Sequence, residues 1–397
     1  MAAKINTVDH KAIISAKFDK AWDHIVKLQK HHMMPSSHKI HTPRVITKKL
    51  VGEILKNVEA TENILVLYNV EFVLELLEQN RLMGANTSET NITFYSDDKE
   101  KTEWVEMMCV KVITELPMDK KFDVVVGNPP FQAQKGNAKI SVGTDIIKLV
   151  MTSLVKDDGV LAMISSSTFL GGGQKGLGYF FSDYNVIDIN LNVNKYFNID
   201  AVQIGYMIIQ NIPSTTSSIT IHNGDDAMAI DTNDFVFNKT KRYIPRNITP
   251  ETLPIFKKIV GYNNEIFDFR ASASKGATYK VGFWAGRNSG ISPKYLKVTK
   301  TGEFKNENLG HPAALDADYP MENIEAVFKG ILFHFVLNVV NGSDTAARPA
   351  NMSYFPKVDL SVKWTFDTLA DEFGLTAEEK QVVLDWAATK GDNFFGE

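Results

Sequence analysis

Short apolar segments alternate with helical patterns between residues 64 and 209, and this alternation restricts the possible folds more than any other feature of the chain. Helical patterns occupy 71–78, 99–108 and 144–154. Uniformly apolar strands are buried on both faces, and helices between strands connect parallel neighbours. The pattern predicts an α/β fold with a parallel sheet covered on both faces. The predicted strands are Ile64–Leu67, Ile92–Tyr95, Val110–Ile113, Phe122–Val126, Gly159–Ser165, Val186–Leu191 and Ile204–Ile209.

The organisation of the chain changes after Gln210, where short mixed segments and turn residues replace the regular alternation. We expect four parts: a helical lead-in at 1–40, an α/β domain at 41–211, a smaller basic domain at 212–320 and a helical segment at 321–397.

The start of the α/β domain carries a helix signal. Thr42 is a good N-cap residue, and proline is favoured at the first helical position, which would be Pro43. A helix is therefore predicted from Pro43 to about Leu55, with Thr42 as its cap.

Charge is distributed unevenly along the chain. The net charge is −4, yet residues 239–305 hold fourteen basic side chains against four acidic ones, so this segment is +10 and the remainder −14. A basic segment beside an acidic body favours contact with nucleic acid, because phosphate binding depends on local charge. The alternative interpretation is a solvated lysine-rich surface.

Several classes of protein are disfavoured by composition. No apolar run reaches the roughly 20 residues of a membrane helix, and the charged N-terminus has no signal core, so a cytoplasmic location is expected. Cys109 is the only cysteine, which excludes an internal disulfide and a multi-thiolate metal site. We expect Cys109 to be a buried small hydrophobe and the histidines near residue 35 to be solvated, with no metal bound.

The sequence Asn128-Pro129-Pro130-Phe131 follows a buried strand directly. Proline has no backbone N–H to donate, so the strand must end at Asn128. In open α/β sheets, ligands bind at the carboxyl ends of the strands. The turn therefore places an amide side chain, two rigid prolines and an aromatic ring where a ligand would lie.

This set of groups suits methyl transfer to an aromatic exocyclic amine. Such an amine is a poor nucleophile, because its lone pair is delocalised into the ring. Two acceptors for its N–H groups, the Asn128 amide oxygen and the Pro129 carbonyl, would stabilise the positive charge that develops on attack. Phe131 offers a face for the base to stack on. The alternative is a strand ended by prolines that has no chemical role.

With this turn, the chain resembles the gamma-type N6-adenine DNA methyltransferases of restriction-modification systems and phages. His41-Thr42-Pro43 resembles the family's N-terminal motif, which implies that Thr42 and Pro43 touch the methionine end of S-adenosylmethionine. Residues 159–170 resemble the fifth-strand signature, and residues 356–379 resemble the closing segment, where Thr376 and Glu379 predict a capping box.

The resemblance also implies roles for other residues. Asn128, Pro129, Pro130 and Phe131 become catalytic, and Phe197, with Tyr196 next, stacks on the far side of a flipped-out adenine. The α/β domain becomes a Rossmann-like S-adenosylmethionine-dependent catalytic domain, and 212–320 becomes the target-recognition domain. The residues expected to bind DNA are Arg270, Lys275, Lys280, Arg287, Lys294 and Lys297.

The first strand departs from the family pattern. It leads into Tyr68-Asn69-Val70-Glu71, which has no glycine to let backbone approach the cofactor. The third strand also lacks its usual aspartate. We expect Tyr68, Asn69 and Glu71 to replace the loop contacts, and Asp97 and Asp98, after the second strand, to bind the ribose diol.

The implied function is transfer of methyl from S-adenosylmethionine to adenine N6 in double-stranded DNA at a specific sequence. The expected partner is double-stranded DNA, with no membrane and no metal, and no oligomeric state is assigned. Three alternatives remain: methylation of a protein glutamine, methylation of RNA adenine, and an inactive DNA-binding protein with an altered cofactor site.

Overall fold

The structure is a computed structural model. The predicted lead-in at 1–40 lies outside the residues it describes. The described residues are 41–58, 61–83, 91–129, 132–135, 138–141, 143–166, 183–197, 203–214, 218–231, 236–237, 241–242, 244–263, 265–267, 279–284, 292–300, 309–315, 319–341, 352 and 354–391.

The chain divides into two compact units. Unit 1 contains Met1–Phe169 and Asp183–Thr215, and unit 2 contains Leu170–Ser182 and Thr216–Glu397. The four-part division expected from the sequence stays a prediction.

Unit 1 is the predicted α/β domain, and every predicted strand is present within a few residues of its expected bounds. Its elements are α2 (Arg44–Asn57), β1 (Ile64–Leu67), α3 (Val70–Met83), β2 (Ile92–Tyr95), α4 (Lys99–Glu106), β3 (Lys111–Ile113), β4 (Phe122–Gly127), β5 (Gln132–Lys135), β6 (Ala138–Ser141), α5 (Gly143–Ser153), β7 (Val155–Ser166), β8 (Asn185–Asn190), α8 (Asn194–Phe197) and β9 (Ile204–Gln210).

The strands of unit 1 follow the order β8-β9-β7-β4-β1-β2-β3. Strands β3, β2, β1, β4 and β7 are mutually parallel, while β9 is antiparallel to both β7 and β8. The prediction of a wholly parallel sheet is therefore wrong for one strand, and the α/β fold class itself is confirmed.

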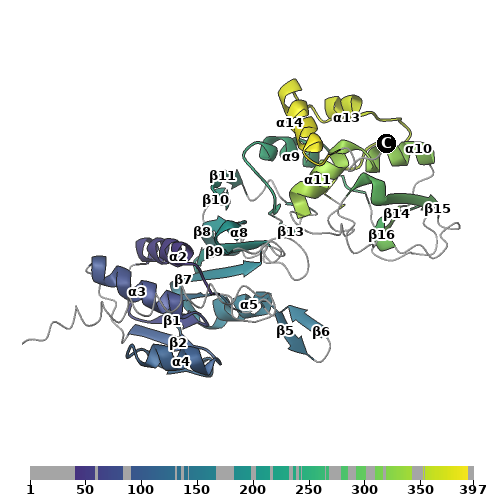
Figure 1. Cartoon of the computed structure of the whole chain (residues 1–397). Helices are drawn as coiled ribbons and strands as arrows, with labels where there is room; N and C mark the ends of the chain where they lie inside the picture. The colour runs from purple at the N-terminus through teal and green to yellow at the C-terminus, as the bar shows by residue number, and fades with distance from the viewer. Residues whose placement is uncertain are drawn as a thin grey trace, which may run out of the picture. The chain divides into compact units, whose positions relative to one another are not determined.

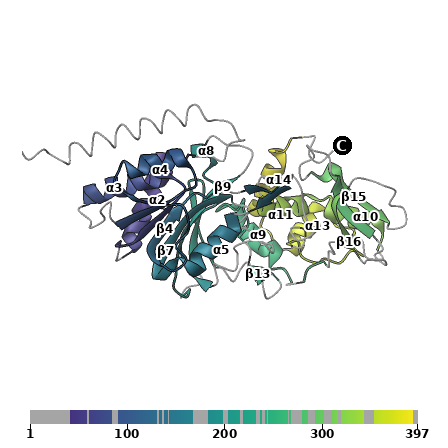
Figure 2. The same cartoon turned by 90° about the horizontal axis from the view of Figure 1, so that it is seen from below.

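The central strands of the sheet are buried on both faces. Every residue of β1 and β4 is buried. The crossovers from β1 to β2 and from β4 to β7 run in opposite directions along the sheet, and right-handed connections then place their helices on opposite faces. Figure 1 labels both helices beside the strands of the sheet, and Figure 2 shows α3 and α5 on opposite sides of it.

Helix α2 begins one residue later than predicted. Its N-cap is Pro43, with no side-chain hydrogen bond, and the first helical residue is Arg44. The prediction of Thr42 as the cap is wrong, because its hydroxyl accepts hydrogen bonds from side chains in other elements.

Unit 2 contains both strands and helices. Its three-stranded sheet has the order β15-β14-β16, with antiparallel neighbours. The elements of unit 2 are β10 (Ser218–Asn223), β11 (Asp226–Asp231), β12 (Val236–Phe237), β13 (Lys241–Arg242), α9 (Thr252–Val260), β14 (Tyr279–Trp284), η3 (Pro293–Tyr295), β15 (Leu296–Lys300), β16 (Leu309–Leu315), α10 (Met321–Phe328), α11 (Ile331–Asn341), α13 (Phe366–Glu372) and α14 (Ala377–Ala388).

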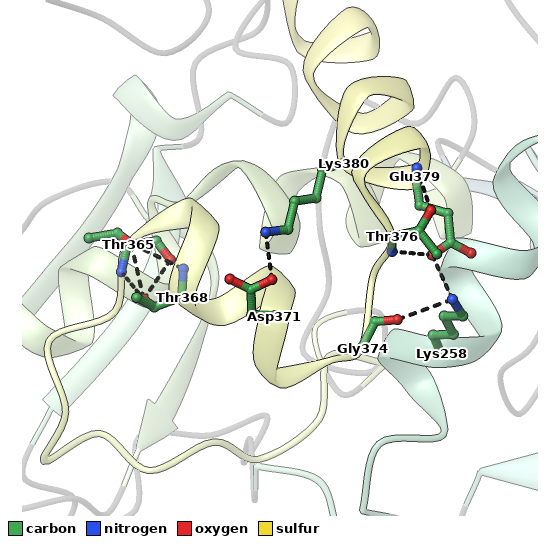
Figure 3. Close-up of polar contacts among 8 residues, drawn as sticks. All are labelled: Lys258, Thr365, Thr368, Asp371, Gly374, Thr376, Glu379 and Lys380. Carbon is green, nitrogen blue, oxygen red and sulfur yellow. Dashed lines mark hydrogen bonds and ion pairs between the residues drawn. The ribbon is translucent and has the colours of Figure 1, made fainter.

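The capping box predicted in the closing segment is confirmed (Figure 3). The Thr376 hydroxyl accepts from the Glu379 backbone N–H at 3.2 Å, and the Glu379 carboxylate accepts from the Thr376 N–H at 2.8 Å. Lys258 of α9 donates to the same carboxylate at 2.6 Å and to the Gly374 carbonyl at 3.1 Å. Lys258 therefore connects α9 to α14. This member of the basic segment has a structural contact within the protein.

Cys109 is exposed, so the prediction that it is buried is wrong. It lies in the turn between α4 and β3, with a φ of 61°.

No single helix in the described part of the chain is long and apolar enough to span a membrane. Only α10 and α11 together, bent by 45°, meet that criterion by length and composition.

Candidate active site

The predicted site residues that follow β1, β2 and β4 lie at one edge of the sheet, where the parallel strands have their carboxyl ends. Leu67, the last residue of β1, pairs with Tyr95 at the end of β2 and with Gly127 at the end of β4. The residues that follow, Tyr68 and Asn128 among them, therefore emerge side by side. This is the edge at which the sequence predicted a ligand site.

Gly127 makes the close approach of β4 to β1 possible. A Cβ atom at this position would lie 2.6 Å from the Leu67 carbonyl oxygen and 2.7 Å from the Leu67 Cβ. Sequence reasoning did not single out Gly127. The available signal is a glycine that ends a strand of valines, which marks a close backbone contact.

The Asn128 side chain is buried and held by Thr42. The Asn128 Nδ2 group donates to the Thr42 hydroxyl at 3.3 Å, and the Asn69 Nδ2 group donates to the same oxygen at 3.2 Å. Among the described residues, none donates a hydrogen bond to the Asn128 amide oxygen. The site therefore holds the nitrogen side of the amide and leaves its oxygen as an acceptor. Pro129, the other predicted acceptor, is also buried.

Glu71 fixes the residues before α2. Its buried carboxylate oxygen Oε1 lies 2.8 Å from His41 Nδ1 and accepts from the Thr42 backbone N–H at 3.2 Å. Glu71 was predicted to contact the cofactor, but its carboxylate is bound to the protein. His41, the first residue of the predicted His41-Thr42-Pro43 motif, is its partner.

The turn after β1 takes a left-handed conformation without a glycine. Tyr68 has a φ of 68°, its N–H donates to the Tyr95 carbonyl at 2.8 Å, and its own carbonyl accepts from Lys101 at 2.9 Å. The two tyrosine rings meet edge to face, with centroids 5.2 Å apart. Burial and the neighbouring Tyr95, with which the Tyr68 hydroxyl is hydrogen-bonded, raise the pKa of this hydroxyl.

Replacing Tyr68 by Gly and by Ala isolates the strain of this turn. Both changes remove the ring, but only glycine adopts a positive φ at no steric cost, and the left-handed conformation costs other residues about 1 kcal/mol. We expect the Tyr68→Gly protein to unfold at a higher temperature than Tyr68→Ala. At positions with a negative φ, alanine is usually more stable than glycine. If Tyr68→Ala unfolded at a higher temperature than Tyr68→Gly, the turn would be unstrained.

The two aspartates after β2 differ. Asp98 is the N-cap of α4, where its side chain accepts from the Glu100 N–H at 3.1 Å. Asp97 is exposed. Of the pair predicted to bind a ribose diol, Asp98 thus has a structural role in the helix, and Asp97 is the stronger candidate.

The predicted stacking residues lie at the same edge of the sheet. Strand β8 runs parallel to β7, because both are antiparallel to β9, so the helix after its carboxyl end, α8, lies at the edge that carries Asn128. Tyr196 and Phe197 are half-buried in α8 and pack against the core of the sheet.

Several predicted residues lie outside the described part of the chain. These are Pro130 and Phe131 of the turn and Arg270, Lys275 and Arg287 of the basic segment, together with the side chain of Lys280 in β14. Lys294 and Lys297 are described and exposed, in η3 and in β15, an outer strand of the sheet of unit 2. Within the described residues, no three acidic, histidine or cysteine side chains form a metal-binding group.

Solved structures are similar to part of this chain at low identity. A chain of a type I restriction-modification system matches with 15% identity and a TM-score of 0.42, over 52% of this chain and 48% of that one. The type I methyltransferase subunit from Streptococcus thermophilus matches with 16% identity and a TM-score of 0.34, over 51% and 50%. This chain thus spans about half the length of these two proteins. Because both TM-scores are below 0.5, the fold assignment depends on the strand order.

One family of known sequences matches the chain. No curated protein matches it significantly. Residues 55–197 match the Eco57I restriction-modification methylase family. The matched segment contains β1 to β8, the Tyr68 turn, Asn128 and α8. The resemblance predicted from the sequence is therefore confirmed for this segment, and the α/β domain is similar to the methylase domains of restriction-modification enzymes.

Proposed function

We propose that this protein transfers a methyl group from S-adenosylmethionine to the N6 amine of adenine in double-stranded DNA, at a specific sequence. One observation carries the proposal: Asn128 emerges at the carboxyl edge of the sheet with its amide nitrogen bound to Thr42. That arrangement leaves the amide oxygen as the acceptor that an aromatic amine requires.

The residues at this edge fit S-adenosylmethionine. The exposed Asp97 carboxylate offers two acceptors for a ribose diol, and the Tyr68 ring offers an aromatic face. Asp98 and Glu71, already bound within the protein, are left out of this set. When bound, the cofactor supplies a methyl group on a positively charged sulfur. The neutral thioether that remains after transfer is a good leaving group.

Asn128 and Pro129 act on the acceptor amine. The Asn128 amide oxygen and the Pro129 carbonyl would each accept one N–H of the amine, which directs the nitrogen lone pair toward the methyl carbon. As the N–C bond forms and the C–S bond breaks, the same oxygens stabilise the positive charge on nitrogen. The surplus proton leaves to solvent afterwards, so no ionisable base is needed.

The adenine must leave the duplex to reach this edge, which costs a few kcal/mol. Stacking on Phe197, with Tyr196 beside it and Phe131 on the other face, would offset part of this cost. The half-buried position of α8 supports this role, because a ring anchored in the core can present its free side to a base.

DNA contact is assigned to the basic segment. Lys297 and Lys300 are exposed on β15, and Lys294 lies just before them with its ammonium 5.0 Å from the Tyr295 ring centroid. The predicted DNA-binding residues Arg270, Lys275, Lys280 and Arg287 belong to the same segment.

Removing Lys294 and Lys297 should weaken DNA binding with a characteristic salt dependence. Each lost phosphate contact lowers the slope of log affinity against log salt by about 0.9. We expect the Lys294→Ala, Lys297→Ala double variant to lose nearly two units of slope in fluorescence anisotropy with duplex DNA. Lys363→Ala is the matched control, since this exposed lysine of unit 2 lies outside the segment and pairs with Glu322. An unchanged slope in the double variant would remove these residues from the DNA contact.

The acceptor class is tested by competition. The protein is incubated with radiolabelled S-adenosylmethionine and equal amounts of long mixed-sequence duplex DNA, the corresponding RNA, and a bacterial protein extract. We expect label in the DNA. Label in protein would indicate the glutamine alternative, and label in RNA the RNA alternative. Calorimetry that detects no cofactor binding would indicate the inactive DNA-binding protein.

The proposed location is the cytoplasm, because a single cysteine forms no internal disulfide and so fits a reducing compartment.

A further inference from the structure

We infer that Thr42 is a positioning residue for Asn128: its hydroxyl fixes the orientation of the Asn128 amide and so selects oxygen as the group that faces the acceptor amine. This inference depends on the proposed function. The two residues are 86 positions apart in the sequence and meet at the edge of the sheet, with 3.3 Å between the Asn128 Nδ2 and the Thr42 Oγ1.

An asparagine amide is nearly symmetric in shape and opposite in chemistry on its two sides. One side is an acceptor, and the other carries two donors. If the amide turned by 180°, its NH2 group would face the acceptor amine, and two sets of N–H groups would meet. A hydroxyl can accept from the nitrogen side or donate to the oxygen side, so Thr42 favours the observed orientation by serving as the acceptor, as it does for both Asn69 and Asn128 in this structure.

Thr42 is suited to be that partner because its own position is fixed. Its side chain is fully buried, and its backbone N–H donates to Glu71, which also binds His41. A β-branched side chain has few accessible rotamers. The hydroxyl therefore stays in one place and accepts from the amides of Asn69 and Asn128 together.

This role differs from the cofactor contact that the family resemblance implies for Thr42. A cofactor contact predicts that loss of the hydroxyl weakens S-adenosylmethionine binding. A positioning role predicts that binding persists while the rate of methyl transfer falls, because a misplacement of about 1 Å can cost about a hundredfold in rate. Measuring both the affinity for S-adenosylmethionine and kcat therefore distinguishes the two roles of Thr42.

The test compares Thr42→Val, which keeps the shape and loses the hydroxyl, with Thr42→Ser, which keeps the hydroxyl. We expect Thr42→Val to lower kcat for duplex DNA about 10- to 100-fold, with the calorimetric Kd for S-adenosylmethionine within about threefold of wild type. Thr42→Ser should stay within about threefold in both. Thr47→Val is the matched control, because Thr47 is buried in α2 and its hydroxyl donates to the Arg44 carbonyl of the same helix at 3.0 Å.

A second readout does not use activity. The side-chain N–H signals of Asn128, assigned in NMR spectra by their loss in Asn128→Asp, should exchange faster with solvent in Thr42→Val than in wild type or Thr42→Ser. If valine is not tolerated at this buried position, Thr42→Ala is measured in its place, with the same expectation.

The inference is overturned if Thr42→Val retains wild-type kcat, or if it weakens cofactor binding without lowering kcat. A wild-type protein that methylates nothing would instead contradict the proposed function. The two failures are therefore distinguishable.

Discussion

Replacing Asn128 by Ala is expected to lower the rate of methyl transfer to DNA by a factor of about 10² to 10³, the usual loss when one preorganised polar partner of a developing charge is removed. The substitution removes the only amide oxygen that this account places against the acceptor amine. The side chain also makes a buried hydrogen bond to Thr42, whose loss lowers the free energy of unfolding by about 1 kcal/mol. The rate is measured in single-turnover assays with saturating S-adenosylmethionine.

The matched control is Asn211→Ala. Asn211 follows β9, which is antiparallel to β7, and so lies at the opposite edge of the sheet, where its amide donates to the Val155 and Lys156 carbonyls at 3.3 Å and 3.1 Å. This variant should lose a similar amount of stability and keep its activity. A folded Asn128→Ala protein with full activity would show that the amide has no part in the reaction.

Replacing Gly127 by Ala is expected to have the largest effect on stability. The added methyl group would meet the carbonyl oxygen and Cβ of Leu67 at less than 3 Å, and neither atom can rotate away. Relief requires β1 and β4 to separate, and overpacking of this kind costs about 1–3 kcal/mol. Because Asn128 is the next residue, activity should fall together with stability. Thermal unfolding and the methylation rate are the measurements.

Gly52→Ala provides the control for Gly127→Ala. Gly52 lies within α2, and an added Cβ would meet only the Gln79 side-chain oxygen, at 3.7 Å. Alanine is favoured over glycine in a helix by about 1 kcal/mol, so this variant should be as stable as wild type or more so. If Gly127→Ala also kept its stability and activity, the close contact between β1 and β4 would not be needed.

Much of unit 1 could be predicted because its strands are uniformly apolar. The bounds of Ile64–Leu67 and Ile92–Tyr95 agree residue for residue with β1 and β2. The reversed direction of β9 was missed, since an apolar segment such as Ile204–Gln210 has the same composition in either direction. Its direction depends on the connections before it, which carry no such signal.

The site was predictable in its chemistry and less so in its contacts. Asn128 could be identified because prolines follow a buried strand. The partners of Thr42 could not, because Asn69 and Asn128 reach its hydroxyl only after the sheet has formed. The local signal at Thr42 suggested a helix cap instead. The missing glycine after β1 was noted in the sequence, but only the structure shows that Tyr68 adopts the conformation a glycine would take.

Nucleoside analysis of methylated DNA identifies the atom that receives the methyl group. Long mixed-sequence duplex DNA is incubated with methyl-labelled S-adenosylmethionine and wild-type protein, digested to nucleosides and separated. We expect the label to co-migrate with N6-methyl-deoxyadenosine and to be absent when Asn128→Ala replaces wild type. Label on cytosine, or equal label from both proteins, would contradict the assignment of the Asn128 edge as the site that holds the adenine amine.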